Sequence, residues 1–323
     1  MAHASSIFRG LASILVLVAL ALCGEPLWAS DWPTQGIRLV VPFAPGASND
    51  ILARALSKPL SDALGQTVVV ENRPGSGGSI GANFVAKARP DGYTLMLTSN
   101  ALASASAVQD TPYDPARDFD LIARVAKSPF VIVTRRDLPA KTIPELIRLA
   151  KASAAPLTYG TTGVGDNIHL ATAMFASRAG IEMTAIAYKG VSPALSDLLA
   201  GRIDLLFTSV TSVKNTAAAE LPILAVSSRE RSPLVGSYPT VGESGIDFAA
   251  DIWWGVFAPA GLPGDIRGRL HDAIEKILAG PEFSALLRNM AAQAPEISYA
   301  QMQKAFVDEV AASRAIAIAA GLR

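Results

Sequence analysis

The sequence predicts an α/β protein with mostly parallel sheets flanked by helices, and three observations carry that prediction. Short apolar, β-branched segments alternate with segments whose apolar residues fall at helical spacing. Turns rich in glycine, proline and asparagine separate these segments. The length of 323 residues suits about two domains of ~150 residues each. Strands that alternate with helices favour parallel pairing with right-handed crossovers.

The first strand is expected at residues 37–41, where the sequence is short, apolar and β-branched. A turn containing Pro42, Pro45 and Gly46 follows, and Asn49 or Asp50 is then expected to cap a helix. The apolar face of that helix is predicted to comprise Ile51, Leu52, Ala55, Leu56, Leu60, Ala63 and Leu64.

This opening turn is interpreted as half of a binding site for a small molecule that bears a carboxylate. A helix N-terminus presents free backbone N–H groups and partial positive charge, which suit an anion. In open α/β sheets, small ligands bind at the edge where the strands end. Taken alone, the stretch also fits an ordinary strand-to-helix connection.

Two further strands are expected in the first half of the chain, at residues 67–71 and 93–98. A glycine loop at residues 72–78 follows the first of them. Ser79 is expected to cap a short helix that reaches about Ala88. All three strands end in small, polar or glycine-rich segments, which is consistent with one shared ligand edge.

The second half repeats the pattern. Thr142 is expected to cap a helix with Pro144 and Glu145 in its first turn. A polar glycine turn at residues 161–167 precedes a helix that carries His169. The remaining strands are expected at residues 130–134, 157–160, 203–207, 223–226 and 253–258, and the remaining helices at about 193–200, 263–279 and 299–319.

Charge, cysteine and histidine content argue against several classes of function. The chain has 28 basic and 28 acidic residues, so neither a nucleic acid nor an anionic membrane is an expected partner. The only cysteine, Cys23, lies in a segment expected to be removed, which leaves no disulfide or thiol chemistry. His169 and His271 are the only histidines of the mature chain, and no cluster has metal-ligand spacing. No metal and no cofactor are therefore expected.

Residues 1–29 are predicted to be a secretory signal peptide, cleaved after Ala29 to within a few residues. Arg9 supplies the positive charge, and Leu11 to Leu22 is an unbroken run of apolar or small residues. That run is too short to span a bilayer, which takes ~20 residues. Lipid attachment at Cys23 is an alternative, against which the large Leu22 before it argues.

Specific motifs extend over essentially the whole mature chain. They are Trp32-Pro33, Ile37 to Phe43, Pro45-Gly46, Glu71 to Gly75, Gly77-Gly78, Ile80-Gly81, Pro90 to Leu95, Asp118-Phe119, Tyr188 to Gly190, Asp204, Pro239 to Gly245, Trp254-Gly255 and Ala258-Pro259. With these motifs, the chain closely resembles the Bug-type periplasmic solute receptors of tripartite tricarboxylate transporters.

The resemblance implies a type II periplasmic binding protein, a two-domain venus flytrap with its ligand in the cleft. Residues 30–124 plus 250–323 would form domain 1, and residues 125–249 domain 2. Family ligands are usually small carboxylates, held largely through backbone N–H groups and water. Carried over, one wall comprises Phe43, Ala44, Gly46, Ala47, Ser48, Asp50, Gly75, Ser76, Gly77, Gly78, Ser79, Thr98, Ser99 and Asn100. The other comprises Thr161, Thr162, Gly163, Asp166, Tyr188, Lys189, Gly190, Asp204 and Ser209.

Departures from the family pattern leave the ligand open. Ala47 replaces a usual second glycine, which reduces the backbone freedom of the opening turn. Ala187 replaces a usual proline, and Thr161-Thr162 replaces smaller residues. Several site residues also have ordinary structural roles: an aspartate such as Asp50 is favoured as a helix cap, and glycines are favoured in any sharp turn.

Two enzyme classes are weaker alternatives. Residues 77–81 match the nucleophile elbow of serine hydrolases, with Ser79 as nucleophile. However, a loop separates Ser79 from the preceding strand, and only His169 or His271 could complete a triad. A dinucleotide-binding fingerprint fails because Ile80 stands where its last glycine belongs.

The expected function is therefore that of a periplasmic receptor, not an enzyme. The receptor would be a monomer that binds a small organic anion and delivers it to the membrane components of a tripartite tricarboxylate transporter. Backbone N–H groups at two opposed helix N-termini would meet the ligand's charge. A receptor that feeds a sensor uses the same fold and is the alternative.

Overall fold

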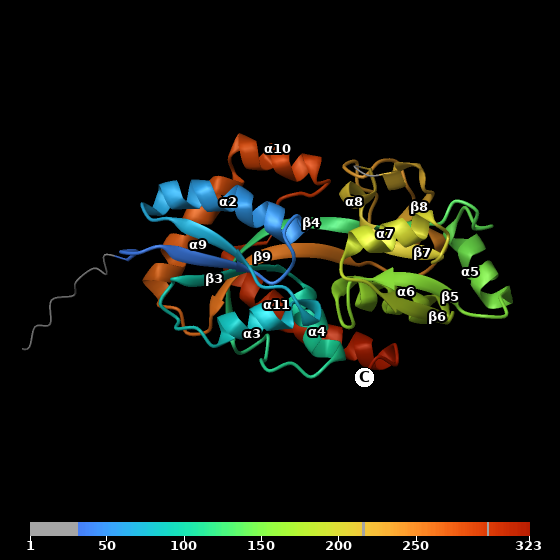
Figure 1. Cartoon of the computed structure of the whole chain (residues 1–323), viewed down its shortest axis with the longest axis horizontal. Coiled ribbons are helices and arrows are strands. Elements are labelled where there is room, and N and C mark those ends of the chain that lie inside the picture. The colour runs from blue at the N-terminus through green and yellow to red at the C-terminus, as the bar shows by residue number, and fades with distance from the viewer. Residues whose placement is uncertain (1–31, 215–216, 296) are drawn as a thin grey trace, which may run out of the picture. The chain divides into compact units, whose positions relative to one another are not determined.

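The computed structural model describes residues 32–214, 217–295 and 297–323, of which residues 35–323 belong to one compact unit (Figure 1). The predicted signal peptide lies outside the described residues. The first part of the unit alternates strands and helices as predicted up to its third strand, and a helix that was not predicted follows. Its elements are β1 (Ile37–Val41), α2 (Ser48–Leu64), β2 (Val68–Asn72), α3 (Ser79–Ala86), β3 (Thr94–Ser99) and α4 (Ala101–Val108).

A long strand, β4 (Phe119–Thr134), leads into a second series of elements. They are α5 (Ile143–Ala152), β5 (Leu157–Thr161), α6 (Asn167–Ala179), β6 (Met183–Ala187), α7 (Val191–Leu199), β7 (Leu205–Ser209), α8 (Val210–Lys214) and β8 (Ile223–Val226). The chain then continues through β9 (Asp251–Pro259), α9 (Gly264–Leu278), α10 (Pro281–Asn289) and α11 (Tyr299–Ala319). Within the described ranges, none of the helices combines the length and the apolar character needed to cross a membrane.

Nine strands within the described residues form one sheet, in the order β2-β1-β3-β9-β4-β7-β5-β6, with β8 also paired to β4. β1 is parallel to β2 and β3, and β5 is parallel to β6 and β7. β4 and β9 run antiparallel to their neighbours, so the strand directions are mixed. The α/β class is confirmed, and helices flank the sheet (Figure 1).

The first half of β4 was not predicted from the sequence, and neither were α4 and α10. A strand was expected only from Phe130, whereas β4 begins at Phe119. Residues 119–129 pair with β9, and residues 130–134 pair with β7 and β8. The pairing with β9 contains two register shifts, which interrupt the simple alternation that identifies a strand from sequence.

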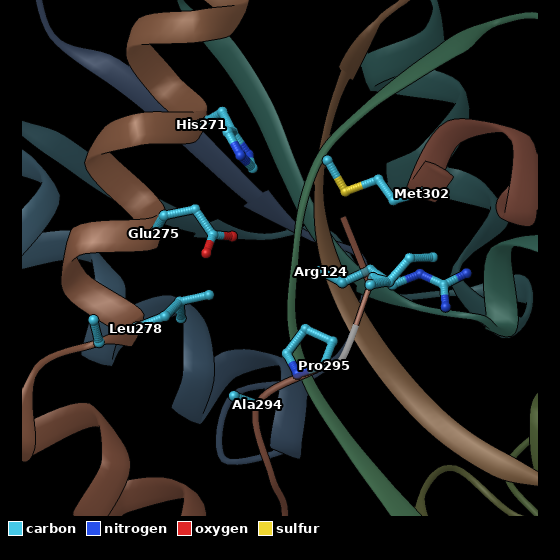
Figure 2. Close-up of a pocket in the computed structure, with 9 residues that line it drawn as sticks. Arg124, His271, Glu275, Leu278, Ala294, Pro295 and Met302 are labelled. Carbon is cyan, nitrogen blue, oxygen red and sulfur yellow. The ribbon is translucent and has the colours of Figure 1, made fainter. Parts of the chain in front are cut away.

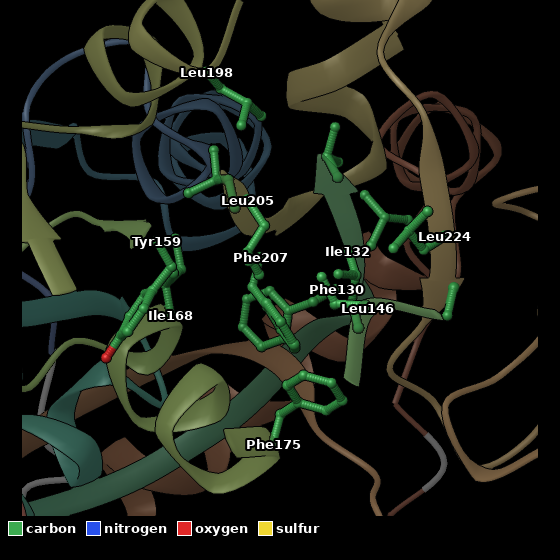
Figure 3. Packing of buried hydrophobic residues seen from close by; sticks show 14 of the residues in the cluster. Phe130, Ile132, Leu146, Tyr159, Ile168, Phe175, Leu198, Leu205, Phe207 and Leu224 are labelled. Atoms are coloured by element: carbon green, nitrogen blue, oxygen red, sulfur yellow. The ribbon is translucent and has the colours of Figure 1, made fainter. Parts of the chain in front are cut away.

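Two large clusters of buried apolar side chains draw on different parts of the chain. One consists of residues between Phe130 and Phe248 together with Ala291 (Figure 3). The other uses residues from 40 to 121 and from 253 to 310. The strand partners of β4 change at residue 130, near the predicted domain boundary. The division into residues 30–124 plus 250–323 and residues 125–249 stays a prediction.

Two predicted helix caps are wrong. α2 begins at Ser48 with Ala47 as its N-cap, so neither Asn49 nor Asp50 caps it. α3 has Gly78 as its N-cap, and Ser79 is its first residue. Each expected cap lies one to three residues after the true N-cap, and Asp50 and Ser79 form their side-chain hydrogen bonds with other parts of the chain.

One predicted cap is confirmed. The Thr142 side chain accepts a hydrogen bond from the backbone N–H of Glu145 at 3.3 Å, at the start of α5. The apolar face of α2 is confirmed in part: Leu52, Leu56 and Leu60 are buried, but Ile51 is 41% exposed.

Candidate functional site

The opening turn lies at an edge where three strand ends come together, because β1, β2 and β3 are parallel. Asn72, at the end of β2, donates from Nδ2 to the backbone oxygen of Phe43 at 3.1 Å and to Oδ1 of Asp50 at 2.9 Å. The Gly46 N–H and Arg54 Nε both donate to Oδ2 of Asp50 at 2.9 Å. Both oxygens of the Asp50 carboxylate are therefore engaged in holding this turn.

The Asp50 carboxyl is buried but ionised. Burial raises its pKa, while hydrogen bonds from Arg54, Gly46 and Asn72 outweigh burial and bring the pKa below the ordinary value. Asp50 thus forms an ion pair with Arg54, whose side chain is about half exposed. Because this pair is neutral overall, the N-terminus of α2 keeps its positive partial charge.

The N-terminus of α2 has no side-chain cap. Ala44 and Ala47 form a turn in which the Ala47 N–H donates to the Ala44 oxygen at 3.4 Å. Ala47 offers no side-chain acceptor, and within the described residues the backbone N–H groups of Ser48, Asn49 and Asp50 donate no hydrogen bond. Three donors are thus available at this end of the helix.

The glycine loop packs against the opening turn. Gly75, Gly77 and Gly78 all have positive φ, and Ser76 shares this conformation at φ 49°. A Cβ on Gly78 would lie 3.2 Å from a ring carbon of Phe43, so a larger residue would push the loop away from the turn. The glycines therefore serve both the sharp turn and the close approach of two predicted site segments.

Ser79 faces into the protein and has no histidine partner. Its side chain is buried, and its Oγ lies 3.3 Å from the hydroxyl of Tyr113. His169 Nδ1 accepts from the Gly165 N–H, and His271 Nδ1 lies 2.9 Å from the Ile122 oxygen. The geometry therefore gives Ser79 no general base, and the hydrolase alternative fails.

The end of β3 is buried and contacts the second half of the chain. Thr98 and Ser99 are each 2% exposed. Asn100 donates from Nδ2 to the Asp251 oxygen at 3.0 Å and to Glu309 at 3.2 Å. Its Oδ1 accepts from Asn167 Nδ2, at the start of α6, at 3.2 Å. Asn100 therefore connects β3 with β9, α11 and α6.

The loop between β5 and α6 is organised around Asp166. The backbone N–H groups of Thr162 and His169 donate to its carboxylate at 2.7 and 2.6 Å, and the Thr161 hydroxyl donates at 2.8 Å. The Thr162 hydroxyl donates to it as well. Asp166 is the N-cap of α6. The two threonines that depart from the family pattern thus bind this carboxylate.

Burial dominates the electrostatics of this second loop. It raises the pKa of Asp166, against the opposing effect of the hydrogen bonds that the carboxylate accepts. Burial also lowers the pKa of His169, against the pull of Asp166, so the imidazole is neutral at physiological pH. Asp166 therefore has hydroxyl and N–H donors around it, but among the described residues it has no cationic partner of the kind that Arg54 provides to Asp50.

The remaining predicted residues fall into two groups. Tyr188 donates from its hydroxyl to Asp197 at 2.9 Å, and exposed Lys189 and the N-cap Gly190 lead into α7. These three follow β6, whose pairing with β5 places them beside Thr161.

Asp204 and Ser209 lie at opposite ends of β7. Asp204 precedes the strand, accepts from Arg135 Nε at 2.9 Å and from Thr158, and so lies at the edge away from Thr161. Ser209 ends the strand, and its Oγ lies 2.9 Å from that of Ser212. The structure therefore does not bring Asp204 together with the loop residues.

The two glycine-containing loops meet each other. A Cβ built on Gly163 would lie 3.8 Å from both Cα and N of Gly77, and one built on Gly77 would lie 3.5 Å from the oxygen of Val164. A Cβ on Gly165 would lie 3.2 Å from Cβ of Val108 in α4. Gly75 to Ser79 and Thr161 to Asp166, assigned from sequence to two opposing walls, are therefore neighbours.

Sequence reasoning missed several residues that shape this region. Asn72 carries the contacts that join β2 to the opening turn, although its position inside the recognised motif offered a clue. Tyr113 and Gln109 belong to a proline-containing stretch without periodicity, so no pattern marked them. Gln109 Nε2 lies 3.7 Å from the position of a Cβ on Gly77.

Two surface cavities lie elsewhere, and none of the predicted ligand-binding residues described by the structure lines either. One, of about 240 Å³, has His271 and Glu275 of α9 on one side and Met302 of α11 and Arg124 on the other (Figure 2). The second, of about 260 Å³, shares Arg124 and adds Lys127, Asp251 and Trp253. Acidic and basic residues are mixed in both, so we do not assign either to a carboxylate.

Comparisons with known proteins point to one family. The family profile described as "Tripartite tricarboxylate transporter family receptor" matches residues 52–322. The protein BugT of Bordetella pertussis is 34% identical over 310 residues, which cover 94% of each chain. An R. palustris protein solved with adipate is 33% identical with a TM-score of 0.82, covering 90% of this chain and 98% of that one. MatC from Rhodopseudomonas palustris with bound malate is 26% identical with a TM-score of 0.80, covering 88% and 99%.

Proposed function

Because the chain belongs to the receptor family of tripartite tricarboxylate transporters, we propose that it binds one small organic carboxylate between two domains and delivers it to the membrane components of such a transporter. It is a solute-binding receptor and not an enzyme. The receptor would act in the periplasm, as a monomer, after removal of residues 1–29.

The observation that carries this proposal is the meeting of two loops beside a helix N-terminus that has available donors. The glycine loop beside the opening turn approaches the loop from Thr161 to Asp166, with Gly77 and Gly163 facing each other. Next to them, the uncapped N-terminus of α2 offers backbone N–H groups to an anion. An arginine clamp is not required for such a site, because backbone donors and a helix N-terminus can meet the charge.

The solved relatives support the carboxylate class. The R. palustris protein at 33% identity was solved with adipate, and MatC with malate. Both ligands carry two carboxylates on a short chain. We therefore place short dicarboxylates first among the candidate ligands of this receptor.

Thermal unfolding of the mature protein with acetate, succinate, malate, adipate and citrate tests the proposal. A ligand at about a hundred times its dissociation constant adds about 2.7 kcal/mol, which is several degrees for a chain of this size. Refolding the protein before the screen removes any ligand that co-purifies. If no carboxylate raises the midpoint of the refolded protein, the proposed function is wrong.

A pair of glycine variants makes the test specific to the loops. Gly77 and Gly65 have similar backbone conformations, at φ 61° and 69°, and a Cβ at either meets no atom closer than ordinary contact distance. Gly77→Ala and Gly65→Ala should therefore cost similar stability, about 1 kcal/mol. Only Gly77→Ala should also abolish the shift by the ligand, and equal shifts in both variants would remove the glycine loop from the site.

A further inference from the structure

The side-chain Nε2 of Gln109 is buried and has no hydrogen-bond partner among the described residues. Gln109 follows α4 directly, as the C-cap residue of that helix. A buried donor without an acceptor costs about 1–3 kcal/mol. Native proteins therefore rarely keep one unless a ligand, an ion or a water completes it.

The Gln109 Nε2 lies where the loop that contains Gly77 meets the loop that contains Gly163. Apart from Gly77 and its two chain neighbours, the described residues place two atoms within 4 Å of the position of a Cβ on Gly77, namely the Val164 oxygen at 3.5 Å and Gln109 Nε2 at 3.7 Å. From the opposite side, the corresponding position on Gly163 lies 3.8 Å from the nitrogen of Gly77. The Gly77 N–H also donates no hydrogen bond in the described ranges. Two unpaired donors thus border one gap.

We propose that Gln109 is a ligand-binding residue whose Nε2 donates a hydrogen bond to a carboxylate oxygen of the bound solute beside Gly77. The inference rests on the proposed function and adds a specific side chain to the site. A carboxylate suits the gap because it is planar and accepts hydrogen bonds only. Gly77 and Gly163 place no side chain between the solute and the Gln109 amide.

An amide donor also contributes to selectivity. When a site offers a buried N–H donor, a solute that lacks an acceptor at that point leaves the donor unpaired and binds more weakly. Gln109 would thus favour an ionised carboxylate over an ammonium or a methyl group at the same position.

Three variants test this role by titration calorimetry with succinate, malate and adipate. Gln109→Met keeps the length of the side chain and removes the donor. Gln109→Glu keeps the shape and places a negative charge against the ligand. Gln66→Glu is the matched control, because it makes the same charge change between α2 and β2, at the edge of the sheet away from the loops.

The expected losses follow from the strength of a hydrogen bond to a charged group. Gln109→Met should weaken binding about tenfold to a hundredfold, Gln109→Glu more, and Gln66→Glu less than about twofold. Because the wild-type donor is unpaired without ligand, Gln109→Met should not lower the unfolding midpoint of the ligand-free protein.

Two outcomes would overturn the inference. If Gln109→Met binds as the wild type does, or if it mainly lowers the ligand-free midpoint, Gln109 is a structural residue, while the receptor function stands. If the wild type binds no carboxylate, the proposed function fails and this inference fails with it.

Discussion

Asp50 and Asp166 each organise a turn that leads from a strand into a helix, Asp50 as the third residue of α2 and Asp166 as the N-cap of α6. Each carboxylate accepts a hydrogen bond from the backbone N–H four residues earlier, that of Gly46 or that of Thr162. Each also accepts from side chains nearby. The difference lies in those side chains: Asp50 pairs with Arg54, whereas Asp166 accepts from the hydroxyls of two threonines.

Because of these different partners, one helix N-terminus keeps its backbone donors available and the other uses them. Beside the neutral pair of Asp50 and Arg54, the end of α2 has no cap and keeps its donors. At the start of α6, Asp166 itself is the N-cap and uses the donors of that end. We therefore revise the expectation of two opposed helix N-termini that share the ligand's charge. The end of α2, with the glycine loop, is the better place for an anion.

The largest effect should come from removing the buried carboxylate of the second turn. Asp166→Ala leaves two backbone N–H groups and two hydroxyls without their acceptor in a buried site. We expect a loss of about 3 kcal/mol in the free energy of unfolding. Asp50→Ala should cost only about 1.5 kcal/mol, because the exposed Arg54 can regain water. Urea denaturation of both variants measures the difference, and equal losses would contradict the comparison.

A smaller effect should follow when the end of α2 receives an acidic cap like that of α6. Ala47→Asp should stabilise the protein by about 1 kcal/mol through the new cap, and its charge should weaken carboxylate binding about fivefold. Ala47→Asn is the control, since it supplies a cap without charge. Titration of both variants with the best ligand decides the point. Should Ala47→Asp bind as tightly as Ala47→Asn, the carboxylate lies away from α2.

The smallest effect is on the pH dependence of the free energy of unfolding. The contributions of Asp50 and Asp166 should change with pH in opposite directions. Asp50 has a lowered pKa, so its contribution to stability is present above the ordinary value of about 3.9 and is lost as the pH falls through the folded-state pKa. Asp166 has a raised pKa, so ionisation in the folded state is unfavourable. Its contribution is greatest in acid and decreases as the pH rises from about 3.9 through the folded-state pKa.

Asn variants at both positions isolate these contributions. The free energy of unfolding of the wild type minus that of Asp50→Asn should rise with pH. The free energy of unfolding of the wild type minus that of Asp166→Asn should fall with pH. Neither slope exceeds about 1.4 kcal/mol per pH unit for a single group. Denaturation between about pH 3 and pH 7 measures both, and slopes of the same sign would show that the two turns do not differ as described.

The same two turns show how far the sequence predicts the site. Strand, glycine turn and helix were identified at both places, because apolar periodicity and turn residues are local properties. The role of Asp50 was not, since it depends on Asn72, which is distant in sequence. Asp166 is bound by its near neighbours Thr161, Thr162 and His169, but apolar periodicity says nothing about which polar groups of a loop bind one another. The expected place of Asp204 in the pocket failed for a related reason. Parallel pairing with β5 puts the start of β7 at the far edge.

The course of β9 has a consequence for the order in which the protein folds. β9 lies between β3 and β4 in the sheet, yet it begins only at Asp251. Almost all of the apolar cluster between Phe130 and Phe248 comes from one continuous part of the chain, whereas β3 has no partner on its second edge until β9 has been made. Contacts of such large sequence separation form slowly and leave an unpaired edge in the meantime. The sheet of β1, β2 and β3 comes first in the sequence, but we expect it to be completed last, when β9 pairs with β3.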